Sequence, residues 1–562
     1  MAEVILPGTY ITVRDEALIT AGRVSTGNIG IVGTSNKGPV GKVVILGSFS
    51  EAREAFGNEG AWVDGSSNEL TLIRSLEQIF NNGGSSVYAV RVASADAKQA
   101  AYQVRDGASG NGPLCLLSAK TPGTWGNTLK IEIANATSNA LVTEQLAGNA
   151  AGLTRKNVVA NAGQNAISLR QASTGQLLSY QIVYDTALNN TLPQVSINTT
   201  TGALAFTTLA GYAPAQADTI LARYEVPAAS SKKVDIYYES VKESYIVADA
   251  AQLAAVVNLR SRLVSASPGD VTNTAFYNVA MANTGTQVLF GTGLNGNLAG
   301  SNGERATAAD YSAGLALLEK DIINIVTLAG QVSSNAPMVT ALQAHLNSTA
   351  EIKRERIGVI GCDGTTDVNV IAGHSLASDR LIFVAPGIKV SESKSLTGAY
   401  TAAAVVGLIA SLPVHSSPTN KVLTIPGLTA NFSTPQLEKL VQNRVLAVEN
   451  RSGFRIVKGI TTSTNSAWHQ ITTRRIVDYA TYGVRSGCNP YIGKLNNVRV
   501  RGAMKATIDA FLTRMVESEA LVSYELDVTA TRAQEIAGEC IVTMTIRPTF
   551  SIDFIMVTMY LG

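Results

Sequence analysis

Apolar and polar side chains alternate along the final segment of the chain, and this alternation limits what the segment can form. Threonine, arginine, serine and aspartate occupy the odd positions from 543 to 553. Apolar residues occupy the even positions Val542, Met544, Ile546, Phe550, Ile552 and Phe554. A period of two is typical of a strand with one buried face, and Pro548 within it predicts an edge strand or two strands with a break. The segment therefore needs a sheet to pair with, because it is too short to form one alone.

The first residues of the chain also have strand character. Pro7 and Gly8 are typical of a turn, and a weakly alternating run follows them. The apolar residues of this segment are Val4, Ile5, Leu6, Tyr10, Ile11 and Val13. We interpret residues 1–22 and 541–562 as arms that cannot own a core. We expect their apolar residues to make the contacts between subunits.

Two outcomes are open for these arms. Each strand could close a sheet within its own subunit. Alternatively, it could pair with the open sheet edge of a neighbouring subunit, with backbone hydrogen bonds supplying the adhesion. If the donating and receiving surfaces differ, such an exchange propagates into rings or helical filaments.

The composition favours a large subunit of an assembly. A chain of 562 residues suggests three or four domains at about 150 residues each. Only 15% of the residues are charged, against roughly 25% in ordinary soluble domains, and a free monomer with so few surface charges is prone to association. Lys+Arg number 44 and Asp+Glu 42, which gives a net charge of +2. This balance predicts neither nucleic acid nor an anionic membrane as a partner.

Cysteine and histidine usage argues against disulfide and metal chemistry. The four cysteines form no CxxC pair, and the four histidines form no HExxH motif. We therefore expect reduced thiols in a protein made in the cytosol, with no metal site and no cofactor. The N-terminus lacks the pattern of a signal peptide. The most apolar stretch, Ala399–Leu412, is shorter than the roughly 20 residues of a membrane span, so we expect a buried helix there and no membrane insertion.

Periodicity along the chain predicts a multidomain α+β protein with a mixed α/β core and a β-rich peripheral insertion. The expected parts are an N-terminal arm (1–22), the first part of an α/β domain (23–96), a β-rich outer insertion (97–245), the second part of the α/β domain (246–390), a C-terminal domain (391–540) and a C-terminal strand arm (541–562).

Individual elements follow from the same patterns. The expected helices include Ala251–Val264, Leu437–Glu449 and Ala503–Ala520. The expected buried strands include Ile357–Gly361 and Leu381–Val384. Thr307 and Asp310 have the spacing of a capping box at the start of a further helix near Ala308.

The Gly291–Gly296 segment matches the GxGxxG pattern of dinucleotide-binding turns. Such a turn requires that its third glycine open a helix whose N-terminus meets the pyrophosphate. Here the chain continues as a loop, and the next helical pattern begins only near Ala308. We interpret the segment as a loop and expect no enzyme activity. A nucleotide-binding enzyme that uses this loop stays as one alternative.

Several motifs occur in a particular order along most of the chain outside 97–245. They are Pro7-Gly8-Thr9-Tyr10, Gly30–Gly33 with Lys37-Gly38-Pro39, Thr124–Asn127 with Leu129, Gly291–Gly296 with the helix to Glu319, Leu440–Val448, Arg474-Arg475 and Asn496–Leu521. In this order they resemble the contractile tail sheath proteins of bacteriophages and related injection machines. In that comparison, Leu440–Val448 resembles a helix, Arg474-Arg475 the strand after it, and Asn496–Leu521 a long helix.

The resemblance implies a structural part of a machine rather than an enzyme. In that family, subunits stack as hexameric rings on an inner tail tube, and contraction of the sheath drives the tube through the host envelope. The implied partners are further copies of the chain itself, the inner tail tube protein, and the baseplate and tail terminator proteins. The implied location is the tail of the virion, after synthesis and assembly in the host bacterial cytoplasm.

The resemblance also implies roles for parts of this chain. The two arms would join neighbouring subunits through a shared sheet, and the C-terminal domain would line the tube. Lys505 and Arg514, which the helical pattern leaves exposed, are then candidate tube contacts. The energy for contraction would be stored in a metastable extended lattice and released as interfaces repack. Another self-assembling lattice protein, such as a capsid or surface-layer subunit, shares the composition and is the second alternative.

Overall fold

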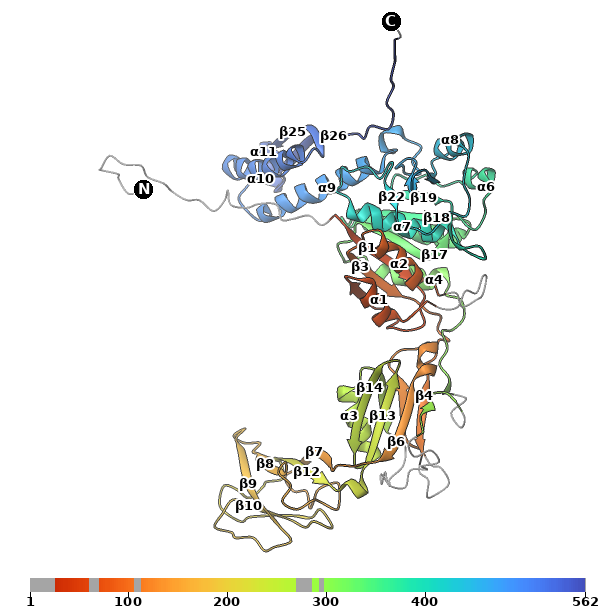
Figure 1. The fold of residues 1–562 in the computed structure, drawn as a ribbon. Helices are drawn as coiled ribbons and strands as arrows, with labels where there is room; N and C mark the ends of the chain where they lie inside the picture. Colours follow the sequence, from red (N-terminus) through yellow and green to blue (C-terminus); the bar gives the residue numbers. More distant parts are fainter. Residues whose placement is uncertain (1–25, 60–69, 106–112, 269–285, 293–297, 561–562) are drawn as a thin grey trace, which may run out of the picture. The chain divides into compact units, whose positions relative to one another are not determined.

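The computed structural model describes residues 26–59, 70–105, 113–268, 286–292 and 298–560. The chain divides into two compact units, of which the first contains Met1–Ser94 and Arg305–Gly562 and the second Ala95–Glu304. The second unit is therefore an insertion between two halves of the first (Figure 1). The expected mixed α/β, multidomain fold is confirmed.

A nine-stranded sheet forms the core of the first unit, in the order β2-β3-β1-β17-β18-β19-β23-β24-β22. Its strands are β1 (Asn28–Gly33), β2 (Val43–Leu46), β3 (Ser86–Arg91), β17 (Ile325–Val332), β18 (Ile357–Gly361), β19 (Leu381–Ala385), β22 (Val422–Leu423), β23 (Leu446–Asn450) and β24 (Phe454–Ile456). The six strands from β3 to β23 run parallel, and β2, β24 and β22 pair antiparallel with their neighbours. Every residue of β18 and β19 is buried, as the apolar runs in the sequence predict for parallel strands covered on both faces.

Helices cover both faces of this sheet (Figure 1). One face packs against α1 (Phe49–Phe56), α2 (Leu72–Asn81) and α7 (Gly398–Ser411). The other face packs against α4 (Ala308–Leu317), α5 (Ala336–Glu351), α6 (Val368–Ala372) and α8 (Thr434–Gln442). A separate hairpin of β20 (Ile388–Ser391) and β21 (Lys394–Leu396) precedes α7.

Two local predictions for these helices are confirmed. The buried helix expected at Ala399–Leu412 is α7, in which most residues are buried. The capping box opens α4, because the Thr307 amide donates to Asp310 Oδ2 at 2.7 Å and the Asp310 amide donates to Thr307 Oγ1 at 3.4 Å. Within the described ranges, no helix is both long and apolar enough to cross a membrane.

The helix expected over Leu437–Glu449 is wrong in its second half. α8 ends at Gln442, and Arg444 has a φ of 64°. The Arg444 amide donates to the Val441 carbonyl and the Val445 amide donates to the Leu440 carbonyl, which is the hydrogen-bond pattern that turns a chain out of a helix. The apolar run that follows is β23. Its pattern fits a helix or a strand, and its pairing with β19 decides the outcome.

A buried histidine and arginine lie beneath the sheet on the α5 side. His345 is 5% exposed, and Arg356 Nη1 donates to its Nε2 at 3.1 Å. The same guanidinium donates to the carbonyls of Leu318 and Asp321 at 3.1 and 3.3 Å. Because arginine can only donate, Nε2 of the imidazole must carry no proton. Burial and the charge of Arg356 lower the pKa of His345 to about 4.

We expect this histidine to make the fold sensitive to acid. The unfolded chain binds a proton at this imidazole near pH 6.5, whereas the folded chain does so only near pH 4. The free energy of unfolding should therefore fall as the pH drops from about 6.5 to about 4, by about 3 kcal/mol in total from this group. Urea unfolding across this pH range measures the effect. His345→Gln keeps an acceptor for Arg356 and should reduce the fall, whereas His415→Gln should keep it. An equal fall in the free energy of unfolding of the two variants would contradict the assignment of the acid sensitivity to His345.

The end of the first unit is a small helical and β subdomain. It contains α9 (Ile471–Cys488), α10 (Val498–Glu517), β25 (Leu521–Thr529), α11 (Arg532–Ala537) and β26 (Ile541–Pro548). α10 confirms the helix expected over Ala503–Ala520. It begins earlier than expected, because Asn497 caps it by accepting a hydrogen bond from the Val500 amide.

Arg474 and Arg475 lie in α9, so the strand that the resemblance implied for them is wrong. The surrounding Thr, Ile and Val residues fit a strand by composition. However, Ile476, Ala480 and Gly483 are buried along one side of the segment at intervals of four and three. That spacing belongs to a helix with one buried face, and the packing of this face against α10 decides the outcome.

Three sheets make the second unit β-rich, as expected for the insertion. Their orders are β11-β10-β9-β8-β12-β7, β14-β13-β6-β16 and β15-β5-β4. The elements are β4 (Ala101–Arg105), β5 (Pro113–Ala119), β6 (Lys130–Asn135), β7 (Ala140–Ala147), β8 (Ala166–Arg170), β9 (Leu177–Tyr184), β10 (Gln194–Ile197), β11 (Leu204–Phe206), β12 (Thr219–Val226), β13 (Lys232–Tyr238), β14 (Val241–Val247), α3 (Ala250–Arg260), β15 (Val264–Pro268) and β16 (Val288–Leu289).

The boundary expected at residue 245 lies inside this second unit, which continues to Glu304. The helix expected at Ala251–Val264 is α3, and its apolar side packs into the same core as β5 and β13. β15 then returns to pair antiparallel with β5. A helix followed by a strand looks like part of an α/β domain in the sequence, but here the strand completes a sheet of the insertion.

Candidate assembly interface at the chain ends

β25 and β26 form a sheet of only two strands, paired antiparallel from Leu521 opposite Pro548 to Thr529 opposite Ile541. One face packs on α10 through Tyr524 and Leu526 of β25 and the even-numbered residues of β26. Among the described residues, neither outer edge of this sheet pairs with a further strand. A sheet of two strands is marginal without further support, and its free edges present unpaired backbone donors and acceptors.

The structure divides the predicted contact residues of the C-terminal arm into two groups. Val542, Met544 and Ile546 lie in β26 and pack, partly buried, against the apolar residues of α10 and its neighbours, which we call the α10 cluster. Phe550, Ile552 and Phe554 lie beyond the strand and are 61%, 81% and 76% exposed. The first group therefore holds the strand on its own subunit, and only the second group presents apolar side chains outward.

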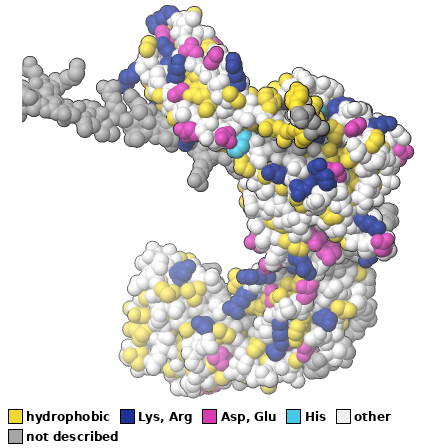
Figure 2. Space-filling model, turned by 45° about the horizontal axis from the view of Figure 1, so that its top comes forward, with side chains coloured by type: hydrophobic (Ala, Val, Ile, Leu, Met, Phe, Trp, Pro, Cys, Tyr) yellow, Lys and Arg dark blue, Asp and Glu magenta, His cyan; other side chains and the backbone are white. Residues whose placement is uncertain are grey.

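The exposed apolar run is longer than the sequence pattern indicated. It continues through Ile555, Met556, Val557, Met559 and Tyr560, all of them exposed. In Figure 2, hydrophobic side chains gather on the visible face of the first unit, whereas acidic and basic side chains are interspersed. The signal in the sequence is the unbroken apolar run Phe554–Val557, in which the residues after Phe554 depart from a period of two.

A cluster around Asp553 fastens the base of this segment to its own subunit. Lys458 Nζ lies 3.5 Å from Asp553 Oδ2, and Gln470 Nε2 donates to the same oxygen at 3.3 Å. Lys458 Nζ also lies 5.0 Å from the centre of the Phe554 ring. We call Lys458, Gln470 and Asp553 the tail clasp. Beyond Asp553, the Phe554 ring contacts Lys458, and the residues from Ile555 to Tyr560 are exposed. The clasp therefore sets where the segment leaves the subunit.

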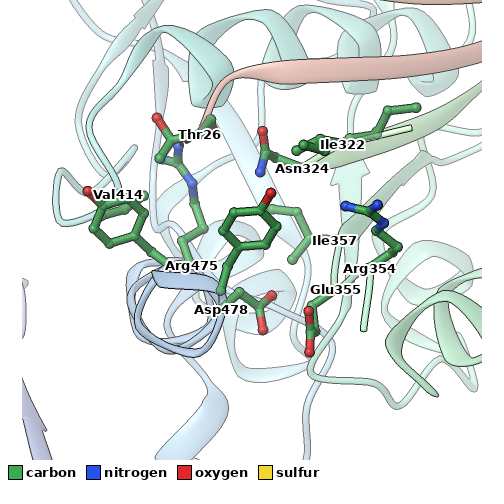
Figure 3. A pocket seen from close by; sticks show the side chains of 12 residues that line it. Thr26, Ile322, Asn324, Arg354, Glu355, Ile357, Val414, Arg475 and Asp478 are labelled. Carbon is green, nitrogen blue, oxygen red and sulfur yellow. Dashed lines mark hydrogen bonds between the residues drawn. The ribbon is translucent and has the colours of Figure 1, made fainter. Parts of the chain in front are cut away.

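The base of the N-terminal segment is held by Arg475 of α9 and by Asn324. The Arg475 guanidinium donates to the Thr26 carbonyl at 3.2 Å, and Asn324 Oδ1 accepts from the Asn28 amide at 3.0 Å. Figure 3 shows Thr26, Asn324 and Arg475 around a small pocket that Asp478 also lines. The predicted contact residues Val4, Ile5, Leu6, Tyr10, Ile11 and Val13 lie outside the described residues.

The two candidate tube contacts lie on α10. Lys505 is exposed, and its Nζ lies 3.3 Å from Asp527 Oδ1 on β25. Arg514 is exposed near the end of the helix, where its Nε donates to the Ala510 carbonyl at 3.2 Å. An ion pair as exposed as that of Lys505 contributes little to folding. Both side chains can therefore reach a partner at little cost to the subunit.

The glycine-rich segment belongs to the second unit, and only its first part is described. Gly291 has a φ of 67°, and its amide donates to the Ala101 carbonyl at 3.1 Å. The chain that follows pairs Ser301 with Lys98, and α4 begins only at Ala308. A phosphate cradle requires the helix to follow the loop directly. In the described ranges, no group of three or more His, Cys, Asp or Glu is placed to hold a metal ion.

A free sheet edge next to an exposed apolar segment is a feature through which one chain can pair with another. Two family models match contiguous parts of the chain: the phage tail sheath protein central domain at residues 304–462 and the phage tail sheath C-terminal domain at residues 463–562. The resemblance to tail sheath proteins seen in the sequence is therefore confirmed over residues 304–562.

Solved structures share the fold over nearly the whole chain. The sheath tail protein Lin1278 from Listeria innocua matches with a TM-score of 0.56 and 14% identity, and the match covers 95% of each chain. The sheath tail protein DSY3957 from Desulfitobacterium hafniense matches with a TM-score of 0.55 and 14% identity, over 96% of this chain and 100% of that one. No curated protein sequence matches the chain.

Proposed function

We propose that the chain polymerises as stacked hexameric rings around an inner tail tube and contracts to drive that tube through a host cell envelope. The observation that carries this proposal is the open β25–β26 sheet with its exposed apolar tail, in a region that matches the sheath C-terminal domain. The protein acts structurally in the virion tail, without catalysis, and meets the tube, baseplate and tail terminator proteins there.

The arms would make the connections within this lattice. An extended segment added to an open sheet edge gains backbone hydrogen bonds, and its alternate side chains gain pockets. We infer that terminal segments of neighbouring subunits, 1–22 and the chain after Asp553, complete the sheet of β25 and β26. Because donor and acceptor surfaces differ, the contact repeats from subunit to subunit rather than closing a pair.

The arms would also keep neighbouring subunits joined during contraction. A tether through backbone hydrogen bonds can persist while side-chain interfaces around it repack, so neighbours stay joined as the lattice shortens. The energy would come from a metastable extended lattice that relaxes when its interfaces change. Interspersed charges on the visible face of the subunit suit such sliding, because no large single-sign patch has to be separated (Figure 2).

Electron microscopy of the purified protein expressed alone tests the proposal. We expect hollow helical tubes with six-fold symmetry, formed by the chain itself or on addition of tube and baseplate proteins. Shells or flat sheets would instead identify another kind of lattice protein. A chain that stays monomeric even with tube and baseplate present would contradict the proposed function.

A further inference from the structure

The N-terminal end of α9 contacts both terminal segments of the chain. Arg475, in the second turn of the helix, donates to the Thr26 carbonyl at 3.2 Å. Gln470, the residue just before the helix, donates to Asp553 of the tail clasp at 3.3 Å. Segments from opposite ends of the sequence are thus both held at the start of α9.

Arg475 is buried, and its guanidinium donates hydrogen bonds to backbone carbonyl oxygens. Besides Thr26, its guanidinium donates to the carbonyls of Leu412 and Pro413 at 2.9 and 3.2 Å. Burial lowers the pKa of Arg475 to about 10, so the side chain remains charged at neutral pH. A planar fork with five donors can serve three carbonyls at once, and a lysine cannot do so with the same geometry. Arg475 therefore joins the base of the N-terminal segment, the end of α7 and α9.

Two residues of the tail clasp, Lys458 and Gln470, lie on short segments that pair with each other at the start of α9. Gln470 forms an isolated β-bridge with Ile460, and the Ile471 amide donates to the Gly459 carbonyl at 3.2 Å. Lys458 and Gln470 therefore stand side by side only when the start of α9 is in position. The neighbouring Arg474 stacks on Trp468, with its guanidinium carbon 4.3 Å from the ring centre. It also forms an ion pair with Asp478, and the two contacts help to hold this end of the helix.

We propose that Arg475 is a positioning residue for both chain ends. It holds the N-terminal segment directly, and through the first turns of α9 it holds Gln470 and Lys458 in the geometry that receives Asp553. A shift of α9 then moves the exits of both segments together. The use of this coupling in contraction, where the arms would join different neighbours, rests on the proposed function. The coupling between the two chain ends is itself a property of the single subunit.

Cross-linking by a water-soluble carbodiimide tests the coupling in the full-length monomer. The reagent condenses a carboxylate with an amine and takes up the water that is lost, so Asp553 and Lys458 become joined by an amide bond. Asp527 and Lys505, 3.3 Å apart on β25 and α10, give an internal reference in the same sample. Mass spectrometry of the two linked peptides gives the ratio of their yields. Asp553→Asn removes the first product and confirms its assignment.

We expect Arg475→Met to lower the yield of the Asp553–Lys458 product about fivefold relative to the reference, the size of a coupling of about 1 kcal/mol. Arg475→Lys should give an intermediate ratio, because it restores the charge and part of the hydrogen bonding. If Arg475→Met unfolds the subdomain, the reference product disappears as well and Arg475→Lys carries the test. A wild-type ratio in a folded variant would overturn the proposal, even if the protein still forms tubes.

Discussion

A chain that ends at Asp553 should fold normally and fail to form tubes. Those of the removed residues that the structure describes, Phe554–Tyr560, are exposed and mostly apolar, so they add almost nothing to the core of their own subunit. Surface changes of this kind alter the free energy of unfolding by about 0.5 kcal/mol or less. On assembly, each such side chain would gain about 1.5–3 kcal/mol when fully buried. The melting temperature tests the first expectation, and sedimentation with electron microscopy tests the second.

The matched variants separate assembly from folding. Ile555→Asp and Val557→Asp should behave as the shortened chain does, whereas Thr558→Ser should assemble normally. Ile546→Asp is a poor test of the interface, because Ile546 packs partly buried against α10 and a charge there should lower the free energy of unfolding by about 1–3 kcal/mol. Normal tubes from the chain that ends at Asp553 would show that its last residues are not the connection between subunits.

Gly361→Ala should destabilise the core of the first unit by about 3 kcal/mol or more. Gly361 is the last residue of β18 and lies against Gly398, the first residue of α7. A Cβ atom at Gly361 would lie 1.9 Å from the Gly398 carbonyl carbon and 2.0 Å from its oxygen. Backbone atoms cannot rotate away as a side chain can, so α7 would have to leave the sheet. Urea unfolding of the purified protein measures the loss.

Gly364→Ala is the control for this prediction. Gly364 follows in the loop after β18, and a Cβ atom there would meet nothing within 4 Å. Its φ is not positive, so alanine adds no backbone strain. We expect its free energy of unfolding to match the wild type or exceed it slightly. Equal stabilities for the two variants would show that α7 does not depend on close contact with β18.

The sequence predicted those parts of the fold that local patterns determine. The period of two identified β26, the buried apolar runs identified β18 and β19, and the Ala-rich stretch identified α7. Each of these elements is specified by the side chains of its own residues. The order of motifs added the resemblance to tail sheath proteins, which no single motif could have supplied.

Long-range contacts explain what the sequence did not predict. The end of α8 depends on the left-handed conformation of Arg444, and the helical state of Arg474 and Arg475 depends on packing against α10. The tail clasp brings Asp553 to Lys458 and Gln470, residues far away in the sequence, and no periodicity signals that meeting. The same holds for Arg475 and Thr26, which lie near opposite ends of the chain.

The central claim is that terminal segments of neighbouring subunits complete the sheet of β25 and β26. A helical reconstruction of the assembled tubes by electron cryomicroscopy, at a resolution that traces the main chain, tests it most directly. We expect further strands along the free edges of this sheet, and we expect each to be connected to the body of a different subunit. Edges left unpaired, or completed by the terminal segments of the same subunit, would contradict the account.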